Sequence, residues 1–252
     1  CSITGYGQTG AYKDRAGHDI NYLALAGVSG HSGRQDGGPP PLGIQIADVA
    51  GGSLHAVIGI LAAVVERQRS GMGQYIDISM TDCVASLNSM AASASLAGQT
   101  PQAPEAGMLN GASFYDYYET QDGRYFSVGS LEPQFMAGLA AALELPLLLA
   151  KSTSFDPEDR QAVKQALQEK FKSQDFVVWQ QLFKTLDICV EPVLSLDEAL
   201  VSPIAEQRGW VVDVPLSENS EQTEAQLACP IKFSRSQIKY AFIGQGLGEG
   251  KW

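Results

Sequence analysis

The segment from residue 48 to residue 80 constrains the fold most, because a long helix pattern runs directly into a strand pattern. Apolar side chains recur every three or four residues over 48–69, which predicts a helix with one apolar face. Gly71 is suited to end this helix, and residues 74–80 then alternate as a strand does. Thr81 can cap a further helix that runs to about residue 96. Asp48 is the expected N-cap of the first helix, and its apolar stripe comprises Leu54, Val57, Ile58, Leu61, Ala62 and Val65.

Strand and helix patterns alternate through the rest of the chain, so the expected fold class is α/β or α+β, organised in two parts. Residues 98–112 are rich in Gly, Gln, Pro and Ala without periodicity, which is typical of a linker. We further expect a strand end and glycine loop at 1–15, a helix at 18–27, a loop at 29–43, a β-hairpin at 114–129, helices at 133–145, 157–172 and 174–186, extended chain at 189–194, a short helix at 196–201, a strand at 209–214 and a polar loop at 217–225.

The composition narrows the possible functions. The chain has 252 residues, of which 44% are hydrophobic, enough for one large or two smaller globular domains. A net charge of −11 argues against nucleic acid as a partner, because phosphate binding needs a basic surface. The four cysteines lack metal-ligand spacing, so we expect no metal site and reduced thiols in a cytoplasmic protein. We also expect no membrane span, since no uninterrupted apolar run reaches about 18 residues, and no signal peptide, since the first residues lack a charged segment followed by an apolar one.

His18 and Asp48 are the first candidates for chemistry, because each lies at the start of a predicted helix. The imidazole of a histidine gains and loses protons near neutral pH. A carboxylate at a helix N-terminus is favoured in its charged form by the free N–H groups and the helix dipole. Plainer interpretations stay open: an exposed structural histidine, and an aspartate that only caps its helix.

Three further features are less specific. Glu132 precedes Pro133 and is a third carboxylate candidate, although it also fits a plain helix N-terminal position. His31 lies in a Gly/Ser loop and His55 inside the long helix, where a structural role is more usual. The glycine-rich segment 5–10 matches neither GxGxxG nor a P-loop. It therefore indicates only that the backbone there approaches some neighbouring group closely.

Taken together, these motifs resemble the family III CoA-transferases, the CaiB/BaiF superfamily, and within it the α-methylacyl-CoA racemase branch. Several motifs in the same order are far more specific than any one of them. The matching segments are GYGQTG at 5–10, GHDINY at 17–22, DVAGG at 48–52, GMGQYID at 71–77, DGRY at 122–125, LEPQF at 131–135 and DICVEPV at 187–193.

The resemblance implies roles for the candidate residues. In the racemases, the residues matched by His18 and Asp48 work on opposite faces of the α-carbon of a 2-methylacyl-CoA, and the glutamate matched by Glu132 orients the histidine. In the transferases, the aspartate matched by Asp48 is the nucleophile, and the compared members generally lack the histidine. No cofactor is implied beyond coenzyme A, which is part of the acyl-CoA thioester substrate. The implied substrate-binding residues are Gly5, Tyr6, Gly7, Asn21 and Tyr22.

The resemblance also implies an architecture. It predicts an incomplete, Rossmann-like α/β large domain at 1–97, a linker at 98–112, a small α+β domain at 113–208 and a C-terminal return to the large domain at 209–252. Family members carry an N-terminal portion that this sequence lacks, and they form interlocked homodimers whose sites lie between the large domain of one subunit and the small domain of the other. Such a dimer would bring Glu132 to His18 and Asp48.

Three hypotheses about function follow. The first is a 2-methylacyl-CoA racemase, the second a CoA-transferase with Asp48 as nucleophile, and the third a non-catalytic binding or dimerisation scaffold. Replacement of His18 separates the first two, because α-proton exchange needs the histidine and acyl transfer does not. Binding of CoA separates both from the third. The sequence does not identify the acyl group.

Overall fold

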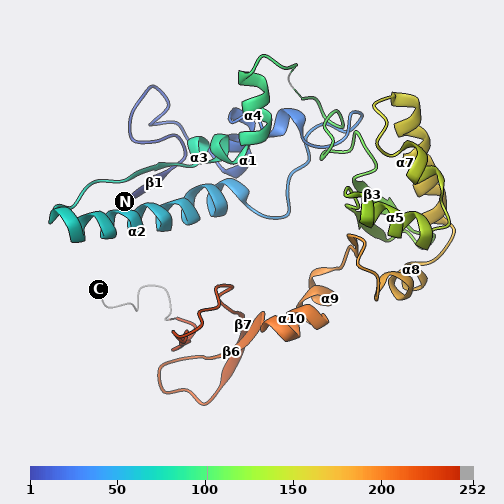
Figure 1. Cartoon of the computed structure of the whole chain (residues 1–252). Helices are drawn as coiled ribbons and strands as arrows, with labels where there is room; N and C mark the ends of the chain where they lie inside the picture. Colours follow the sequence, from blue (N-terminus) through green and yellow to red (C-terminus); the bar gives the residue numbers. More distant parts are fainter. Residues whose placement is uncertain (101, 245–252) are drawn as a thin grey trace. The chain divides into compact units, whose positions relative to one another are not determined.

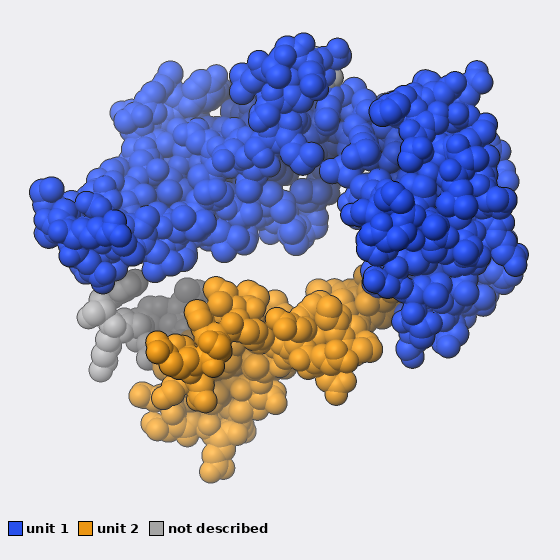
Figure 2. All heavy atoms as spheres, viewed as in Figure 1, with its two compact units in different colours: residues 1–191 blue, residues 192–252 orange. Residues whose placement is uncertain are grey.

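The computed structural model describes residues 1–100 and 102–244 (Figure 1). The chain divides into two compact units, residues 1–191 and residues 192–252, which Figure 2 colours separately. The domain ranges expected from the sequence refer to a larger family architecture and stay a prediction.

In chain order the helices and strands are β1 (Ser2–Thr4), α1 (Asp19–Leu25), the 3-10 turn η1 (Ser29–His31), the π-helix η2 (Ala47–Leu54), α2 (His55–Ser70), β2 (Asp77–Ser79), α3 (Met80–Leu87), α4 (Ser89–Leu96), β3 (Asp116–Glu119), β4 (Tyr125–Val128), α5 (Pro133–Ala142), α6 (Leu147–Lys151), α7 (Pro157–Lys172), α8 (Phe176–Phe183), β5 (Val190–Pro192), α9 (Leu196–Leu200), α10 (Pro203–Arg208), β6 (Val211–Pro215) and β7 (Thr223–Leu227).

The first part of unit 1 is a parallel α/β arrangement. β1 pairs with β2 in parallel, with Ser2 opposite Asp77, and the connection between them passes through α1, η2 and α2. A parallel pair requires a long crossover of this kind. Helices α1, η2 and α3 pack together over a small core of Tyr22, Leu23, Ala47 and Val84. The expected α/β class is therefore confirmed.

The long helix begins differently from the sequence expectation. Its end is as predicted, because Gly71 adopts a left-handed φ of +75° and its N–H bonds to the carbonyl of Arg67. Its start is a π-helical segment whose N-cap is Ile46, so Asp48 lies inside the first turn. The expectation that Asp48 is the N-cap is wrong, because the side chain of Asp19 on α1 accepts the N–H bonds at this end instead.

Two other expectations need correction. The helix predicted from Thr81 to about residue 96 is two helices, α3 and α4, because the backbone of Asn88 leaves helical geometry at φ −80° and ψ 25°. The polar loop predicted at 217–225 ends early, since residues 223–227 form β7 and pair with β6. The side chains of β7 are largely polar and almost all exposed. The strand therefore lacks the alternation of apolar and polar residues by which strands are recognised in a sequence.

Most of the apolar face of the η2–α2 stretch is exposed. Leu54, Ile58 and Leu61 are each more than half exposed. The 24-residue stretch Ala47–Ser70 is long and apolar enough to cross a membrane by length and composition, with 17% of its most apolar window buried. The core helix of a soluble protein meets the same criterion, so this single stretch is weak evidence for a membrane span.

The second part of unit 1 is a three-stranded sheet in the order β3-β4-β5, packed against helices. The predicted hairpin is confirmed, since β3 and β4 pair antiparallel, and helix α7 spans the predicted residues 157–172. Phe171 on α7 is fully buried and is the centre of this core. Its ring lies 5.4–5.9 Å, between centroids, from those of Tyr118, Phe126, Trp179 and Phe183.

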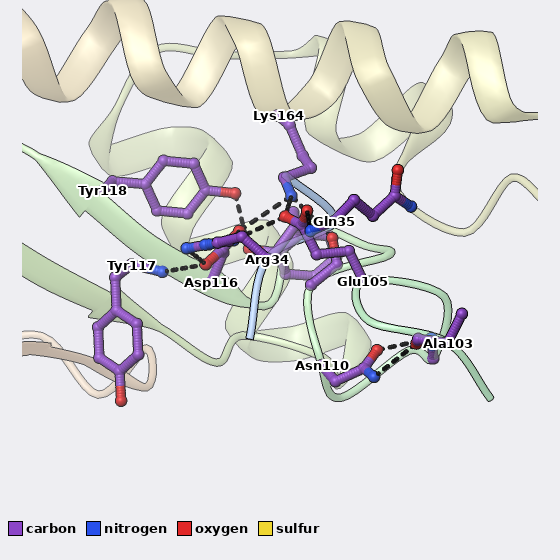
Figure 3. A network of polar contacts seen from close by, with 12 residues as sticks. Arg34, Gln35, Ala103, Glu105, Asn110, Asp116, Tyr117, Tyr118 and Lys164 are labelled. Atoms are coloured by element: carbon purple, nitrogen blue, oxygen red, sulfur yellow. Dashed lines mark hydrogen bonds and ion pairs between the residues drawn. The ribbon is translucent and has the colours of Figure 1, made fainter. Parts of the chain in front are cut away.

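A network of charges joins the loop after η1 to this sheet (Figure 3). Arg34 donates to both carboxylate oxygens of Asp116 at 2.6 and 2.7 Å, and to Glu105 at 2.9 Å. Lys164 reaches the same two carboxylates from α7, at 2.9 Å for Asp116. The two-pronged geometry of a guanidinium matches a carboxylate, so the network fixes residues 34–35 against β3 and α7.

Unit 2 is a small α/β element of its own. Helix α10 is capped by Ser202, whose hydroxyl accepts from the N–H of Ala205, and ends at Gly209 with a left-handed φ of +58°. The chain then enters the hairpin β6–β7, in which Val211 lies opposite Leu227. The predicted strand at 209–214 and short helix at 196–201 are thus confirmed as β6 and α9.

The aromatic core generates a stability prediction. Phe171→Ala removes a fully buried ring and is expected to lower the free energy of unfolding by about 3–5 kcal/mol. Phe155→Ala is the matched control, because that ring is 88% exposed and its loss is expected to cost about 0.5 kcal/mol or less. Urea unfolding of both variants measures the difference, and equal midpoints would contradict the packing described.

The charged network generates a pH prediction. Burial raises the pKa of the Asp116 carboxyl, but hydrogen bonds from Arg34 and Lys164 outweigh it and hold that pKa below its usual range. A carboxyl whose pKa is lower when folded stabilises the protein above its unfolded pKa of about 3.9 and loses this contribution as pH falls through the folded value. We therefore expect Asp116→Asn to flatten the loss of stability below about pH 4. Urea midpoints across this range check it, with Asp213→Asn on β6 as control, and an unchanged slope would contradict it.

Candidate active site

The glycine loop and α1 pack on each other through two tyrosines. The hydroxyl of Tyr22 donates to the carbonyl of Gly17 at 2.6 Å, and its ring meets that of Tyr6 edge-on at 5.2 Å. A Cβ on Gly5 or on Gly17 would overlap these rings, so both positions require glycine. The predicted substrate-binding residues Gly5, Tyr6 and Tyr22 therefore lie together.

The glycine loop is held in place by α3 and β1. Thr81 donates to the carbonyl of Gly5 twice, from its hydroxyl at 2.7 Å and from its N–H at 3.1 Å. Gly7 turns with a left-handed φ of +81°, which a residue without Cβ adopts freely. Its N–H donates to the hydroxyl of Thr4. These contacts shape the backbone beside Tyr6 without using its side chain.

His18 is the exposed N-cap of α1. Its backbone N–H donates to the side-chain oxygen of Asn21 at 3.0 Å, and its carbonyl accepts from the N–H of Asn21. The imidazole is therefore presented at the first turn of a helix whose start is fixed by Asn21. This places Asn21 next to the candidate base, as a positioning group.

The backbone of Asp48 bonds to the side chain of Asp19, the residue that follows His18. The carboxylate of Asp19 is 7% exposed and accepts from the N–H of Ala47 at 2.5 Å and of Asp48 at 3.2 Å. Because Asp19 directly follows His18, this contact places the backbone of Asp48 beside the residue next to His18. Asp48 is half-buried, and its charge acts on Tyr22, whose pKa is raised by burial first, then by Tyr6 and Asp48.

The π-helical turn after Asp48 depends on two glycines. A Cβ on Gly52 would lie 3.1 Å from side-chain atoms of Ile3 and Met80, and one on Gly51 would lie 3.2 Å from the carbonyl of Met80. The turn therefore sits unusually close to β1 and α3. Single π-turns inside helices occur frequently at functional sites.

Glu132 lies in the other part of unit 1. It is the exposed N-cap of α5, with Pro133 at the first helical position. Its charge acts on Cys189, whose pKa is raised by burial first and then by Glu132. Within residues 1–100 and 102–244 of one chain, no hydrogen bond or ion pair joins Glu132 to His18 or Asp48.

The described residues hold no cluster of three or more His, Cys, Asp or Glu side chains suited to a metal ion. The two competing histidines have bonded rings: His31 with Asn88 at 3.1 Å, and His55 with the carbonyl of Ala50 at 2.7 Å. His18 is thus the remaining histidine candidate, one residue before Asp19. The chemistry available to this cluster is proton transfer, or attack by a carboxylate.

Sequence reasoning missed Asp19 as a functional residue. It lies within the GHDINY segment, but its role depends on a contact between α1 and η2 that periodicity does not predict. The available signal was the position of Asp19, an acidic residue next to a candidate base in a segment predicted to start a helix.

The role of Asp19 can be tested directly. Asp19→Ala leaves two N–H groups of η2 without their acceptor, which is expected to lower the free energy of unfolding by about 1–3 kcal/mol. Asp14→Ala is the control, because Asp14 is exposed on the preceding loop. Chemical unfolding compares the two, and equal stability would show that Asp19 does not hold η2.

The comparisons with known proteins agree on the family. The model of CoA-transferase family III matches residues 1–243. The α-methylacyl-CoA racemase of Mus musculus is 41% identical over 203 residues, covering 79% of this chain and 52% of that protein, and the Homo sapiens racemase is 38% identical over 212 residues, covering 82% and 54%. The succinyl-CoA:glutarate CoA-transferase of Homo sapiens is 29% identical over 219 residues, covering 85% and 49%.

The solved structures agree on the fold. A CAIB/BAIF family protein from Brucella suis has a TM-score of 0.74 at 26% identity and covers 96% of this chain and 63% of that one. The chain spans about half the length of the curated relatives it matches. By its sequence across residues 1–243 and by its fold, the chain belongs to CoA-transferase family III.

Proposed function

We propose that this chain carries the proton-transfer residues of a 2-methylacyl-CoA racemase. The observation that carries the proposal is the buried carboxylate of Asp19, which holds the first turn of η2 beside the start of α1. The backbone of Asp48 thereby lies beside Asp19, the residue that follows His18. The similarity to α-methylacyl-CoA racemases at 38% and 41% identity supports this class of reaction.

The chemistry needs two groups that alternate between acid and base. An α-proton beside a thioester is acidic enough for a positioned general base to remove. One of His18 and Asp48 takes the proton from one face, which leaves an enolate, and the other gives a proton back to the opposite face. The configuration at the α-carbon inverts, and the two groups exchange protonation states until solvent resets them.

The acyl-CoA thioester is the proposed substrate, and coenzyme A enters only as part of it. The loop residues Gly5, Tyr6 and Gly7, with Asn21 and Tyr22, are the proposed contacts. The closeness of the backbone to Tyr6 and Tyr22 at Gly5 and Gly17 supports this assignment.

Glu132 is proposed to orient His18 across a homodimer. A site shared between two subunits accounts for the absence of a bond from Glu132 to His18 within the described residues of a single chain. The exposed apolar face of the η2–α2 stretch supports burial against further protein, because such a surface is costly in water.

A CoA-transferase is the second candidate. Asp48, in the first turn of a helical stretch, would be the nucleophile, and the similarity to the succinyl-CoA:glutarate CoA-transferase favours this alternative. A non-catalytic scaffold is the third, because the chain spans about half the length of its relatives. The presence of a histidine at position 18 favours the racemase.

Proton NMR in D₂O tests the proposal. Loss of the α-proton signal of a 2-methylacyl-CoA is expected with the chain, and His18→Ala is expected to slow it by at least about 100-fold, the usual effect of losing a general acid–base group. Asp48→Asn is expected to act similarly.

The matched control is Asp82→Asn, in the first turn of α3, which is expected to exchange at the parent rate. A free carboxylate acceptor added to the same tube detects acyl transfer. If the parent shows no α-proton exchange and His18→Ala still transfers the acyl group, the racemase proposal is wrong and the CoA-transferase proposal takes its place. If neither reaction occurs and CoA does not bind, the non-catalytic scaffold is the remaining hypothesis.

A further inference from the structure

The π-helical segment η2, which contains Asp48, needs more support than an ordinary helix does. A π-helix spaces its bonds five residues apart, where an α-helix spaces them four apart, and it is rare because this wide turn is less stable. Gly51 and Gly52 lie in the middle of η2, and glycine is among the poorest helix formers. Contacts from side chains are therefore expected to hold the turn.

Two side chains make such contacts, and each comes from five residues beyond the carbonyl that it meets. The ring nitrogen Nδ1 of His55 lies 2.7 Å from the carbonyl oxygen of Ala50, while the backbone N–H of His55 bonds to the carbonyl of Gly52. The hydroxyl of Ser53 donates to the carbonyl of Asp48 at 3.2 Å. Both side chains thus reinforce the five-residue spacing that defines a π-helix.

The contact to Ala50 fixes the hydrogen on the ring of His55. A carbonyl oxygen can only accept a hydrogen bond, so Nδ1 must carry the hydrogen. The neutral imidazole is thereby held in its Nδ1–H form. His55 is half-buried at the junction of η2 with α2, so its ring bonds back onto the turn that precedes it.

These bonds set the direction in which the side chain of Asp48 leaves η2. The N–H of Asp48 is held by the carboxylate of Asp19, and its carbonyl is held by Ser53. The ring of His55 holds the next part of the turn at Ala50. A change from five-residue to four-residue spacing would break the side-chain bonds and rotate Asp48 about the helix axis relative to α2.

We propose that His55 is a positioning residue whose ring holds the π-helical turn that presents Asp48. It acts through the backbone of Ala50 and takes no proton from the substrate. The inference rests on the proposed function, because the direction of Asp48 affects activity only if its carboxylate takes part in the reaction. His55 should then affect the chemical step and leave the binding of the acyl-CoA thioester unchanged.

Two substitutions of His55 separate the ring bond from general helix stability. His55→Leu removes the donor but introduces a better helix former. His55→Asn keeps a donor, because its side-chain N–H can replace Nδ1–H, and its helix propensity is similar to that of histidine. His31→Leu is the matched control, since His31 is also half-buried and has a bonded ring, but lies on η1.

NMR of the full chain without substrate tests the bond itself. Spectra of the ¹⁵N-labelled ring are expected to show His55 in its Nδ1–H form. The amide signals of Ala47 and Asp48 report the position of η2, because both N–H groups bond to the carboxylate of Asp19. His55→Leu is expected to shift both signals upfield as these bonds lengthen, whereas His55→Asn and His31→Leu leave them in place. An Nε2–H form of His55, or unshifted amide signals in His55→Leu, would overturn the inference.

Exchange of the α-proton of a 2-methylacyl-CoA in D₂O tests the effect on the reaction. His55→Leu is expected to lower kcat about tenfold or more, because a displacement of about 1 Å can cost 100-fold, with KM and the urea midpoint unchanged. His55→Asn is expected to restore most of kcat, and His31→Leu to match the parent. An unchanged kcat in His55→Leu, an equal loss in His55→Asn, or a loss explained by a lower urea midpoint would each overturn the positioning role.

The two measurements fail separately. If the NMR results are as expected and the parent does not exchange the α-proton, His55 still holds η2 and the proposed function is wrong. If the parent exchanges the α-proton and the amide signals do not move in His55→Leu, the inference is wrong and the proposed function stands.

Discussion

The buried carboxylate of Asp19 is the contact on which the candidate site depends. A desolvated carboxylate is tolerated only when hydrogen bonds compensate its charge, and here the N–H groups of Ala47 and Asp48 provide them. The bond closes a small core in which Tyr22 and Val84 pack against Ala47. Without it, the helix after residue 46 would lose its cap and its register with α1.

A second contact of the same kind fixes the other half of unit 1. Arg34 and Lys164 neutralise the carboxylates of Asp116 and Glu105, which hold the loop after η1 on the sheet. Arg34 and Asp116 of this network also line a cavity of about 1090 Å³ in unit 1.

Much of the fold could be predicted, since helix α7, the β3–β4 hairpin and the end of α2 follow from local patterns. The errors arose where a distant side chain decides the structure. Asp48 has the composition of an N-cap, but Asp19 supplies that function from another helix. Asn88 interrupts a helix pattern with a turn of the backbone.

The candidate site was less accessible to sequence reasoning than the fold. The sequence identified His18, Asp48 and Glu132 as candidates, and their roles stay a prediction; the structure adds the bond from the backbone of Asp48 to Asp19, the residue after His18. The cavity lined by Arg34 and Asp116 was not predicted, because its walls come from residues far apart in the chain.

The central claim is that two groups on opposite faces of one carbon exchange its proton. A single enantiomer of a 2-methylacyl-CoA, incubated with the chain in D₂O and stopped early, tests it most directly. We expect the inverted product to carry solvent deuterium at the α-carbon. Inverted product that retains the original proton would contradict it, because one group would then have carried the proton across.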